Sequence, residues 1–515
     1  MTRLFAAATL AAGLAFPAAA ETFRWSSTTD PSTMDPHAVS STPVLGFLTN
    51  VYEGLVRRGR DMTIEPALAT RWEPLPDGAG WRFYLREGVT FHDGAAFTAE
   101  DVRFSYERAA SEASDVRSWF APVSDLVVVD DYTVDILTST PQPIFPDSIA
   151  NWMMMDSGWA EANGAVAVAR DAENFATLNA NGTGAFRLVS RQPDLETVLE
   201  PFAGWWGEVE HTVTRAVFTP IQNPATAVAA LLSGEIDMIN PVPVQDAERI
   251  DAADGTTVLR GIETRVIMLG FAHDHAELQG GGDNPFSDVR VRRAVAHAVN
   301  VPAILQTIMR GSAEPASQLV PPSARGFSPA LDSRPAYDPE AARALLAEAG
   351  YPDGFAFSLS CTNDRYINDE QVCQAVTGML AQVGMTATLE AMPVSNYWPE
   401  LRADNFDMYL LGWSPGTFDA EHPLRFLVHT AGDRLGTWNF GGYTNPRIDE
   451  LLPMIQSEID DTARQAMLDE AAATVQDDMV YVPLYVEPLL WGLRDGIEVT
   501  QRPDNFFVLR WVNHR

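Results

Sequence analysis

Two spacings of hydrophobic residues alternate along this chain. In one, hydrophobic and polar side chains take turns, which is typical of strands, and in the other, hydrophobic residues recur every three or four positions, which is typical of helices. The strand-like segments are 22–25, 81–97, 129–138, 185–191, 355–361, 385–393 and 406–413, and the helix-like segments are 43–58, 98–109, 223–234, 284–311, 338–350 and 368–385. Strands that alternate with helices in this way predict α/β layers.

Local signals mark the ends of several of these elements. Thr98 is a favoured helix N-cap, and two acidic residues follow it in the positive first turn of an expected helix. Gly182 and Gly184 come just before an expected strand, a position that suits the close approach of two backbones.

Composition narrows the classes of function. The chain has 515 residues and a formal charge of −34, which argues against nucleic acid as a partner because phosphate binding rests on clustered Lys and Arg. All 35 basic residues are Arg. The absence of Lys removes P-loop phosphate binding by a lysine and the pyridoxal Schiff base. The chain also lacks a His-Glu-x-x-His motif and a Cys cluster.

The first twenty residues predict a cleaved secretory signal peptide. An Arg near the start is followed by an apolar stretch and then by Ala18, Ala19 and Ala20 before Glu21, the pattern of an A-x-A cleavage site. The apolar stretch is shorter than the roughly 20 residues that span a membrane. No Cys lies at the cleavage point to carry a lipid. We therefore expect a soluble, unlipidated mature chain in the periplasm, beginning at Glu21.

Motifs in a fixed order resemble the family 5 solute-binding proteins of ABC importers, the dipeptide, oligopeptide and nickel type. They are MDPH at 34–37, NVYEGLVRR at 50–58, the segment 66–109 with its FHDG, NGTGAFRL at 181–188, NPFSDVRVRRAVAHAVN at 284–300, FDMYLLGW at 406–413, NFGGYTNPRIDELL at 439–452 and VPLYVEP at 482–488. The resemblance covers essentially the whole mature chain.

The resemblance implies an α/β fold of two lobes, a type II, cluster C-like periplasmic binding protein with an extra subdomain inserted in the first lobe. Lobe I would comprise 21–268 and 480–515, with 51–181 as the inserted subdomain, and lobe II would comprise 269–479. Crossing strands would join the lobes, which close over a solute so that a membrane permease can sense the closed form.

The implied function involves no chemistry on the ligand. We expect the periplasmic substrate-binding subunit of an ABC transporter, a monomer without cofactor or metal, which captures a peptide or peptide-like solute. It would deliver that solute to the permease and its ATPase at the inner membrane. Two alternatives stay open. One is the same role for an oligosaccharide, an opine-like conjugate or a metal chelate, and the other is a secreted hydrolase that uses paired carboxylates.

The segment Gly412–Gly416 resembles the family's ligand loop in the second lobe. The expected ligand contacts there are Gly412, Trp413, Ser414 and Gly416. The indole of Trp413 would stack on the ligand while backbone groups hydrogen-bond to it. Peptide binders of the family carry an Asp three residues after this Trp, which pairs with the peptide's α-amino group, and this chain has Gly416 instead. Asp419 or Glu421 is the expected substitute from the same loop. If neither reaches the ligand, a solute other than an unmodified peptide is the alternative.

Three further segments offer ligand contacts by the same resemblance. Tyr397 and Trp398 stand where the family places an aromatic wall, and since neighbouring side chains face different ways, one of the two rings is expected in the core. The loop that follows the ligand's backbone in the family holds Thr28, Asp30 and Met34. Tyr485, near the expected hinge, is a comparable candidate.

The only two cysteines, Cys361 and Cys373, are predicted to form a disulfide. A zinc site needs more thiolate or imidazole ligands than this segment holds, and redox pairs are usually spaced Cys-x-x-Cys. An exported chain also lives where disulfides persist. The bridge would brace a loop at the cleft whose candidate contacts are Asn363, Arg365 and Tyr366. Arg365 would bind an anionic group of the ligand, or else pair with Asp364 or Asp369.

Two groups of histidines suggest chemistry only weakly. His273 and His275, with Glu277 beyond, have metal-ligand residue types, but they lie in a polar, Gly-rich stretch where a solvated loop is the alternative. His92 and Asp93 are interpreted as hairpin residues and not as a catalytic pair.

Overall fold

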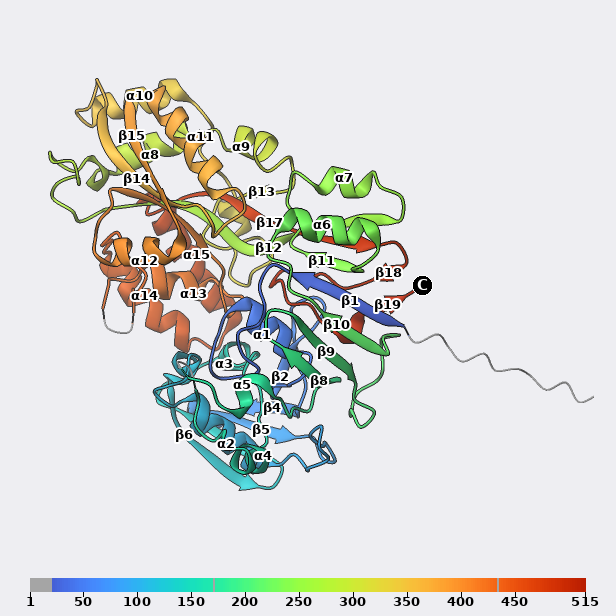
Figure 1. Ribbon diagram of the computed structural model, residues 1–515. Helices are drawn as coiled ribbons and strands as arrows, with labels where there is room; N and C mark the ends of the chain where they lie inside the picture. Colours follow the sequence, from blue (N-terminus) through green and yellow to red (C-terminus); the bar gives the residue numbers. More distant parts are fainter. Residues whose placement is uncertain (1–20, 170–171, 433–434) are drawn as a thin grey trace, which may run out of the picture.

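The structure, a computed structural model, describes residues 21–169, 172–432 and 435–515, so the expected signal peptide at 1–20 lies outside the described residues. The main body is one continuous eleven-stranded sheet that runs through both halves of the molecule (Figure 1). Its strand order is β15-β14-β16-β12-β17-β11-β1-β10-β9-β8, with β13 beside β17.

The first half of the sheet contains the N-terminal strand. Its strands are β1 (Thr22–Ser27), β8 (Phe186–Gln192), β9 (Glu196–Pro201), β10 (Arg215–Phe218) and β11 (Met238–Asn240), and its helices are α1 (Thr42–Leu48), α6 (Pro224–Ser233) and α7 (Ala247–Asp251). β1 runs parallel to both of its neighbours, β10 and β11. A buried aromatic cluster that includes Phe23, Trp25 and Phe218 packs beneath these strands.

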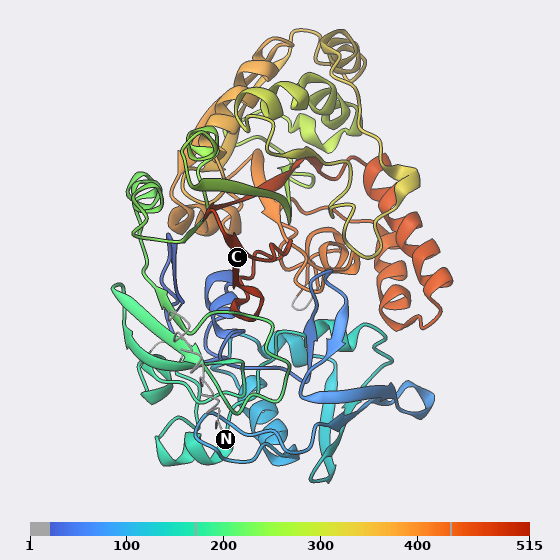
Figure 2. The same cartoon turned by 90° about the vertical axis from the view of Figure 1, so that its right-hand side faces the viewer.

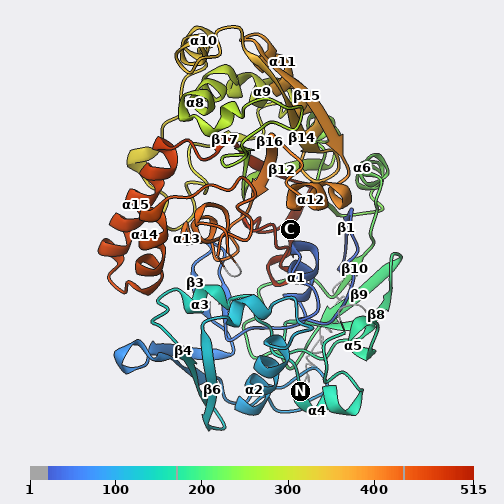
Figure 3. The ribbon, with the colours of Figure 1, turned by 90° about the vertical axis from the view of Figure 1, so that its left-hand side faces the viewer.

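The second half of the sheet is covered by more helices. Its strands are β13 (Glu314–Pro315), β14 (Phe355–Thr362), β15 (Met385–Met392) and β16 (Met408–Trp413), and its helices are α8 (Val289–Ala298), α9 (Val301–Thr307), α10 (Pro339–Glu348), α11 (Asp369–Ala381), α12 (Val394–Arg402), α13 (Glu421–Pro423), α14 (Pro446–Ser457) and α15 (Asp461–Asp477). Figure 3 shows α14 and α15 side by side on the flank of this half. Two hydrophobic clusters, one on each face of the sheet, form its core.

A separate layer lies at the end of the molecule opposite α10 (Figures 2 and 3). It holds the antiparallel sheet β4-β5-β7-β6 and the hairpin β2-β3, with a hydrophobic cluster of its own. Its strands are β2 (Val56–Arg58), β3 (Ile64–Pro66), β4 (Ala69–Pro74), β5 (Gly80–Leu85), β6 (Val123–Asp130) and β7 (Thr133–Thr138), and its helices are α2 (Ala99–Ala109), α3 (Phe145–Ser148), α4 (Ser157–Ala162) and α5 (Phe175–Leu178). These elements occupy the range 51–181 that the sequence indicates as an insertion.

Two long antiparallel strands, β12 (Thr256–Phe271) and β17 (Val482–Arg494), connect the halves. One end of this pair adjoins β11, and the other end adjoins β16. Ile262 pairs with Pro488 and Val266 with Val486, so three residues of β12 stand opposite the single Glu487. This is a bulge, which locally bends and twists a strand. The expected lobe boundary at 268 falls inside β12, and the one at 480 falls just before β17.

Several local predictions are confirmed. Thr98 and Asp101 form a capping box at the start of α2. At Gly182 a Cβ atom would lie 2.0 Å from the carbonyl oxygen of Val51, which is why only glycine fits there. The prediction of one helix over 43–58 is wrong, because α1 ends at Leu48 and 56–58 form β2.

Candidate functional site

A cleft of about 1090 Å³ lies where the crossing strands pass between the two halves. Its walls come from β1 and the loop after it, α1, β11, β12, the loop before α11, α12, β16 and β17. Residues that line it from the first half include Trp25, Thr28, Phe47 and Met238, and those from the second half include Arg365, Tyr366, Trp398, Trp413 and Trp438.

Three tryptophans form one wall of the cleft. Trp398 comes from α12, Trp413 ends β16, and Trp438 follows in a loop. The ring of Trp438 stands edge-on to both others, with centroids 5.3 Å from Trp398 and 5.6 Å from Trp413. Aromatic surfaces of this kind bury a flat or apolar part of a ligand.

The ring of Trp413 is held in place by a histidine. Its indole N–H donates to Nδ1 of His422 over 3.1 Å. Burial, with a smaller contribution from Arg425, lowers the pKa of His422 well below its usual range. The imidazole therefore stays neutral and keeps a lone pair for this hydrogen bond.

The loop after Trp413 is tied to both neighbouring segments. The carbonyl of Gly412 accepts from the Tyr366 hydroxyl at 3.3 Å, and the Ser414 hydroxyl bonds to the hydroxyl of Thr264 on β12. Residues 412–416 also have the Gly-x-Ser-x-Gly spacing of a hydrolase nucleophile. Within the described chain, however, no histidine or carboxylate bonds to Ser414, and a nucleophilic serine needs such a base.

Neither expected substitute for the amino-anchoring Asp is free for a ligand. Asp419 is buried and makes two hydrogen bonds of 2.8 and 2.9 Å to Arg464. Glu421 is also buried, and it accepts from Gln456 at 2.6 Å and lies 3.5 Å from Arg425. Both carboxylates are compensated inside the second half. Gly416 is exposed and is not part of the cleft lining.

The predicted disulfide between Cys361 and Cys373 is confirmed. Cys361 is in β14, and Cys373 is the fifth residue of α11. The bridged loop lines the cleft with residues 364–367, whereas Asn363 lies outside the lining and donates its backbone N–H to Met392.

The carboxylate of Asp369 holds the bridged loop by accepting hydrogen bonds from the loop's backbone. It accepts from the N–H groups of Arg365 and Tyr366 at 3.0 and 3.1 Å. The guanidinium of Arg365 lies 5.4 Å from the centroid of the Tyr366 ring, and no ion pair to it is present in the part of the chain that the structure describes. Arg365 is exposed at the cleft.

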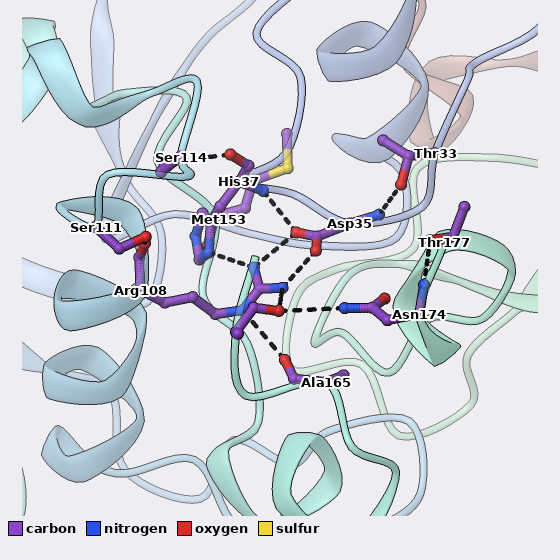
Figure 4. A network of polar contacts seen from close by, with 11 residues as sticks. Thr33, Asp35, His37, Arg108, Ser111, Ser114, Met153, Ala165, Asn174 and Thr177 are labelled. Atoms are coloured by element: carbon purple, nitrogen blue, oxygen red, sulfur yellow. Dashed lines mark hydrogen bonds and ion pairs between the residues drawn. The ribbon is translucent and has the colours of Figure 1, made fainter. Parts of the chain in front are cut away.

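The first loop reaches the cleft at its two ends, with Thr28 at one and residues 40–43 at the other. Its middle is anchored in the inserted layer by Asp35, which is buried and paired with both terminal nitrogens of Arg108 (Figure 4). The ring of His37 lies between Arg108 and the carbonyl of Met153. This network fixes the course of the loop.

The other sequence candidates are either paired or buried in the fold. Asp30 pairs with Arg191 at 2.8 Å, and Met34 is in the core. Tyr397 is fully buried and donates to the carbonyl of Leu410 at 2.6 Å, so its neighbour Trp398 is the ring at the cleft. Tyr485 is fully buried as well, and burial raises its pKa well above the usual value.

The floor of the cleft carries three charges at the bulge of the crossing strands. Glu263 and Arg265 lie on β12 and Glu487 lies on β17, and all three line the cleft. Arg265 is 3.2 Å from Glu263 and 3.4 Å from Glu487. Glu487 also accepts the backbone N–H of Ile367 at 2.7 Å, which connects β17 to the bridged loop.

These charges alter one another's protonation. Burial raises the pKa of Glu487 to about 7, with Arg265 opposing and Glu263 adding to the shift. Burial works against the charge on Arg265, yet the two glutamates hold its pKa above the usual value.

The three histidines that the sequence suggested outside the cleft contact neighbouring parts of the fold. A ring nitrogen of His273 bonds to the carbonyl of Val480, the ring of His275 packs on Phe406, and His92 bonds to the carbonyl of Gly184. Over residues 21–169, 172–432 and 435–515, no group of three or more His, Cys, Asp or Glu side chains is placed to hold a metal ion. Among the helices in those ranges, none has the length and apolar character of a membrane span.

Comparison with known proteins identifies the family. A model of the bacterial extracellular solute-binding proteins, family 5, matches residues 63–434, well over half of the chain. The chain belongs to this family. A curated relative, the glutathione-binding protein GsiB of Shigella dysenteriae, is 26% identical over 471 residues, which cover 89% of this chain and 88% of the relative.

Solved structures of such solute-binding proteins share the fold. The periplasmic binding protein DppA of Helicobacter pylori, in complex with the peptide STSA, superposes with a TM-score of 0.79 at 24% identity, covering 96% of this chain and 98% of that one. The protein AgaA of A. tumefaciens R10, in complex with agropinic acid, has a TM-score of 0.76 at 25% identity, covering 95% and 96%. The expected two-lobed α/β fold is thereby confirmed.

The sequence did not single out four of the cleft residues, namely Trp438, Glu263, Arg265 and Glu487. For Glu487 a signal was present, because it is the one charged residue in the hydrophobic run VPLYVEPLLW. A charge in such a run is costly unless it is paired or functional. Trp438 follows Gly436 in a loop, where hydrophobic periodicity carries no information.

Proposed function

We propose that this family 5 protein is the periplasmic substrate-binding subunit of an ABC importer and that it captures a peptide or peptide-like solute. The observation that carries the proposal is the cleft of about 1090 Å³ at the crossing strands, lined from both lobes. Ligand sites are usually about 300–1,000 Å³, so this one suits a solute of a few residues. We further propose lobes divided near 268 and 480, and a monomer that docks on a permease with its ATPase.

The composition of the cleft favours a solute with mixed character. The tryptophan wall offers apolar and aromatic surface, Arg365 offers an exposed cation, and the carboxylates of Glu263 and Glu487 lie on the floor. A short peptide combines an apolar side chain with groups of both charges. The names of relatives, a glutathione-binding protein and a structure with a bound peptide, support the same class.

A non-peptide solute is the second candidate. Tryptophan walls also stack on sugar rings, and AgaA was solved with agropinic acid. A neutral oligosaccharide, however, has no group to match the ion pairs on the floor, and burying them against it leaves charges uncompensated. A serine hydrolase would need a base beside Ser414, whose hydroxyl bonds to Thr264 and to no acid or histidine among the described residues. A carboxylate-based hydrolase would need two free carboxylates, whereas Glu263 and Glu487 are both held by Arg265.

Native mass spectrometry tests the proposal. The chain is purified from its periplasm, its retained mass is recorded, and the unfolded and refolded chain is then offered an equimolar library of tripeptides and a library of oligosaccharides. We expect capture of tripeptides and their recovery intact after release. Capture of oligosaccharides alone would replace the peptide class by the second candidate. Cleavage products in the released fraction would overturn the binding role.

A further inference from the structure

The bulge charges carry an excess of negative charge. Glu263 and Glu487 share one guanidinium, that of Arg265. The side chains of Glu263 and Glu487 are only 10% and 5% exposed, so solvent compensates little of the excess. A buried charge is costly unless it is paired. The pair of glutamates therefore favours a cation from the ligand and disfavours an anion.

The other acids near the cleft do not share this property. Asp419 and Glu421 each have their own arginine. Asp364 lines the cleft but is exposed, and it accepts the backbone N–H of Val394 at 2.8 Å. Among the described residues of the lining, only the bulge has two buried carboxylates on one ion-paired guanidinium; Arg365, which faces Glu487 from the bridged loop, is exposed to solvent and forms no ion pair with it.

We propose that Glu263 and Glu487 are specificity-determining residues, which require the captured solute to carry an ammonium or guanidinium group against the crossing strands. The inference rests on the proposed function and names the chemical class of its solute. The cationic group of the solute would then lie against the two strands that join the lobes. A cation bound there interacts with β12 and β17 at the bulge and, through the hydrogen bond from Ile367, with the bridged loop of the second lobe.

The proposal predicts a proton linkage. Five titratable or charged groups face Glu487: Glu263 and Arg265 on β12, Arg365 and Tyr366 in the bridged loop, and Tyr485 on β17 itself. With its pKa near 7, Glu487 is about half protonated at pH 7, and a bound cation favours the ionised form. Binding should then release about half a proton at pH 7 and tighten as the pH rises from 6 to 8.

The test uses three tripeptide libraries on the full chain, read by native mass spectrometry. The first has free α-amino groups and no Lys, Arg or His, the second is the same library after N-acetylation, and the third is N-acetylated with one Lys or Arg. We expect capture from the first, the third or both, and none from the second. Capture from the second library, which carries no cationic group, at equal affinity would overturn the inference and leave the peptide class standing. Capture from no library would overturn the proposed function, and the inference with it.

Calorimetry on one captured tripeptide then locates the cation. Glu487→Gln keeps an acceptor for the N–H of Ile367 but removes the charge, and we expect at least tenfold weaker binding and no proton release across buffers of different ionisation enthalpy. Glu263→Gln is the second variant and should also weaken binding at least tenfold. Glu248→Gln makes the same charge change at an exposed residue of α7 outside the cleft lining, with an expected effect below twofold. Equal affinities of all three folded variants and the unchanged chain would sink the inference.

Discussion

A single substitution at Trp413 tests whether the aromatic wall of the cleft contributes to binding. Its ring packs between Trp438 and Phe426, and its free face lines the cleft. Trp413→Ala removes that surface, so we predict at least about tenfold weaker binding of a captured tripeptide, or about 1.4 kcal/mol. Calorimetry measures it. Trp159→Ala, a half-buried ring of α4 far from the lining, should leave affinity unchanged, and an unchanged affinity for the Trp413 variant itself would contradict its role.

His422 is a positioning residue for that ring. His422→Leu removes the acceptor of the indole N–H, and because a hydrogen bond of this kind contributes about 1 kcal/mol, we predict about fivefold weaker binding. His422→Gln carries an amide oxygen and should recover most of the loss. If both variants bind equally weakly, the hydrogen bond of 3.1 Å does not orient Trp413 and the loss comes from packing.

The sequence could name the tryptophan of the loop but not which of two adjacent rings faces the cleft. Tyr397 and Trp398 differ by about 100° around α12, and the contact that decides between them, the hydrogen bond from Tyr397 to Leu410, comes from β16. The sequence also could not show that Asp419 and Glu421 are unavailable to a ligand. Their partners Arg464, Gln456 and Arg425 lie on other segments, so no local pattern showed that both carboxylates are engaged.

Among the elements, the bridged corner between β14 and α11 controls the cleft wall most directly. The disulfide closes a loop with a sequence separation of 12, for which chain entropy predicts about 3 kcal/mol. We predict that Cys361→Ala/Cys373→Ala lowers the free energy of unfolding by about that amount and also weakens tripeptide binding, since residues 364–367 line the cleft. Urea unfolding and calorimetry measure the two effects.

A reductant supplies the control for the bridge. It should lower the stability of the unchanged chain toward that of the double variant and leave the double variant unaffected. A reductant that changes both proteins equally would mean that the effect does not come from the disulfide.

The expected helix over 43–58 shows where element prediction fails. Its hydrophobic residues have helical spacing, yet they are buried by different neighbours: Leu48 and Val51 in the cluster under β1, and Leu55 and Val56 in the cluster of the inserted layer. A straight helix cannot reach both cores. Tertiary packing therefore overrides the periodicity, and the chain leaves the helix at Leu48.

For the molecule as a whole, the fold followed from the order of motifs, whereas the charged floor of the cleft did not. Glu263 and Glu487 are separated by 224 positions (487 minus 263) and meet only because β12 and β17 pair around a bulge. Register between distant strands is set by the packing of both lobes, which no window of sequence contains. The alternation of strands and helices, by contrast, is local and was predictable.

Buried neutral histidines should lower the stability of the whole molecule in acid. A substitution of His273 measures the contribution of one of them. Burial, with Arg292 second, lowers its pKa to about 3, against about 6.5 in an unfolded chain. The unfolded state therefore binds the extra proton, and stability is present above pH 6.5 and is lost as the pH falls toward 3. Between pH 8 and pH 5 this costs about 2 kcal/mol. The free energy of unfolding of His273→Gln should fall by about 2 kcal/mol less than that of the unchanged chain between pH 8 and pH 5. Urea unfolding measures both, and pH 8 is the baseline because residue 273 is uncharged there in both proteins. Parallel pH profiles for the two proteins would show that His273 takes up its proton in the folded state as readily as in the unfolded one.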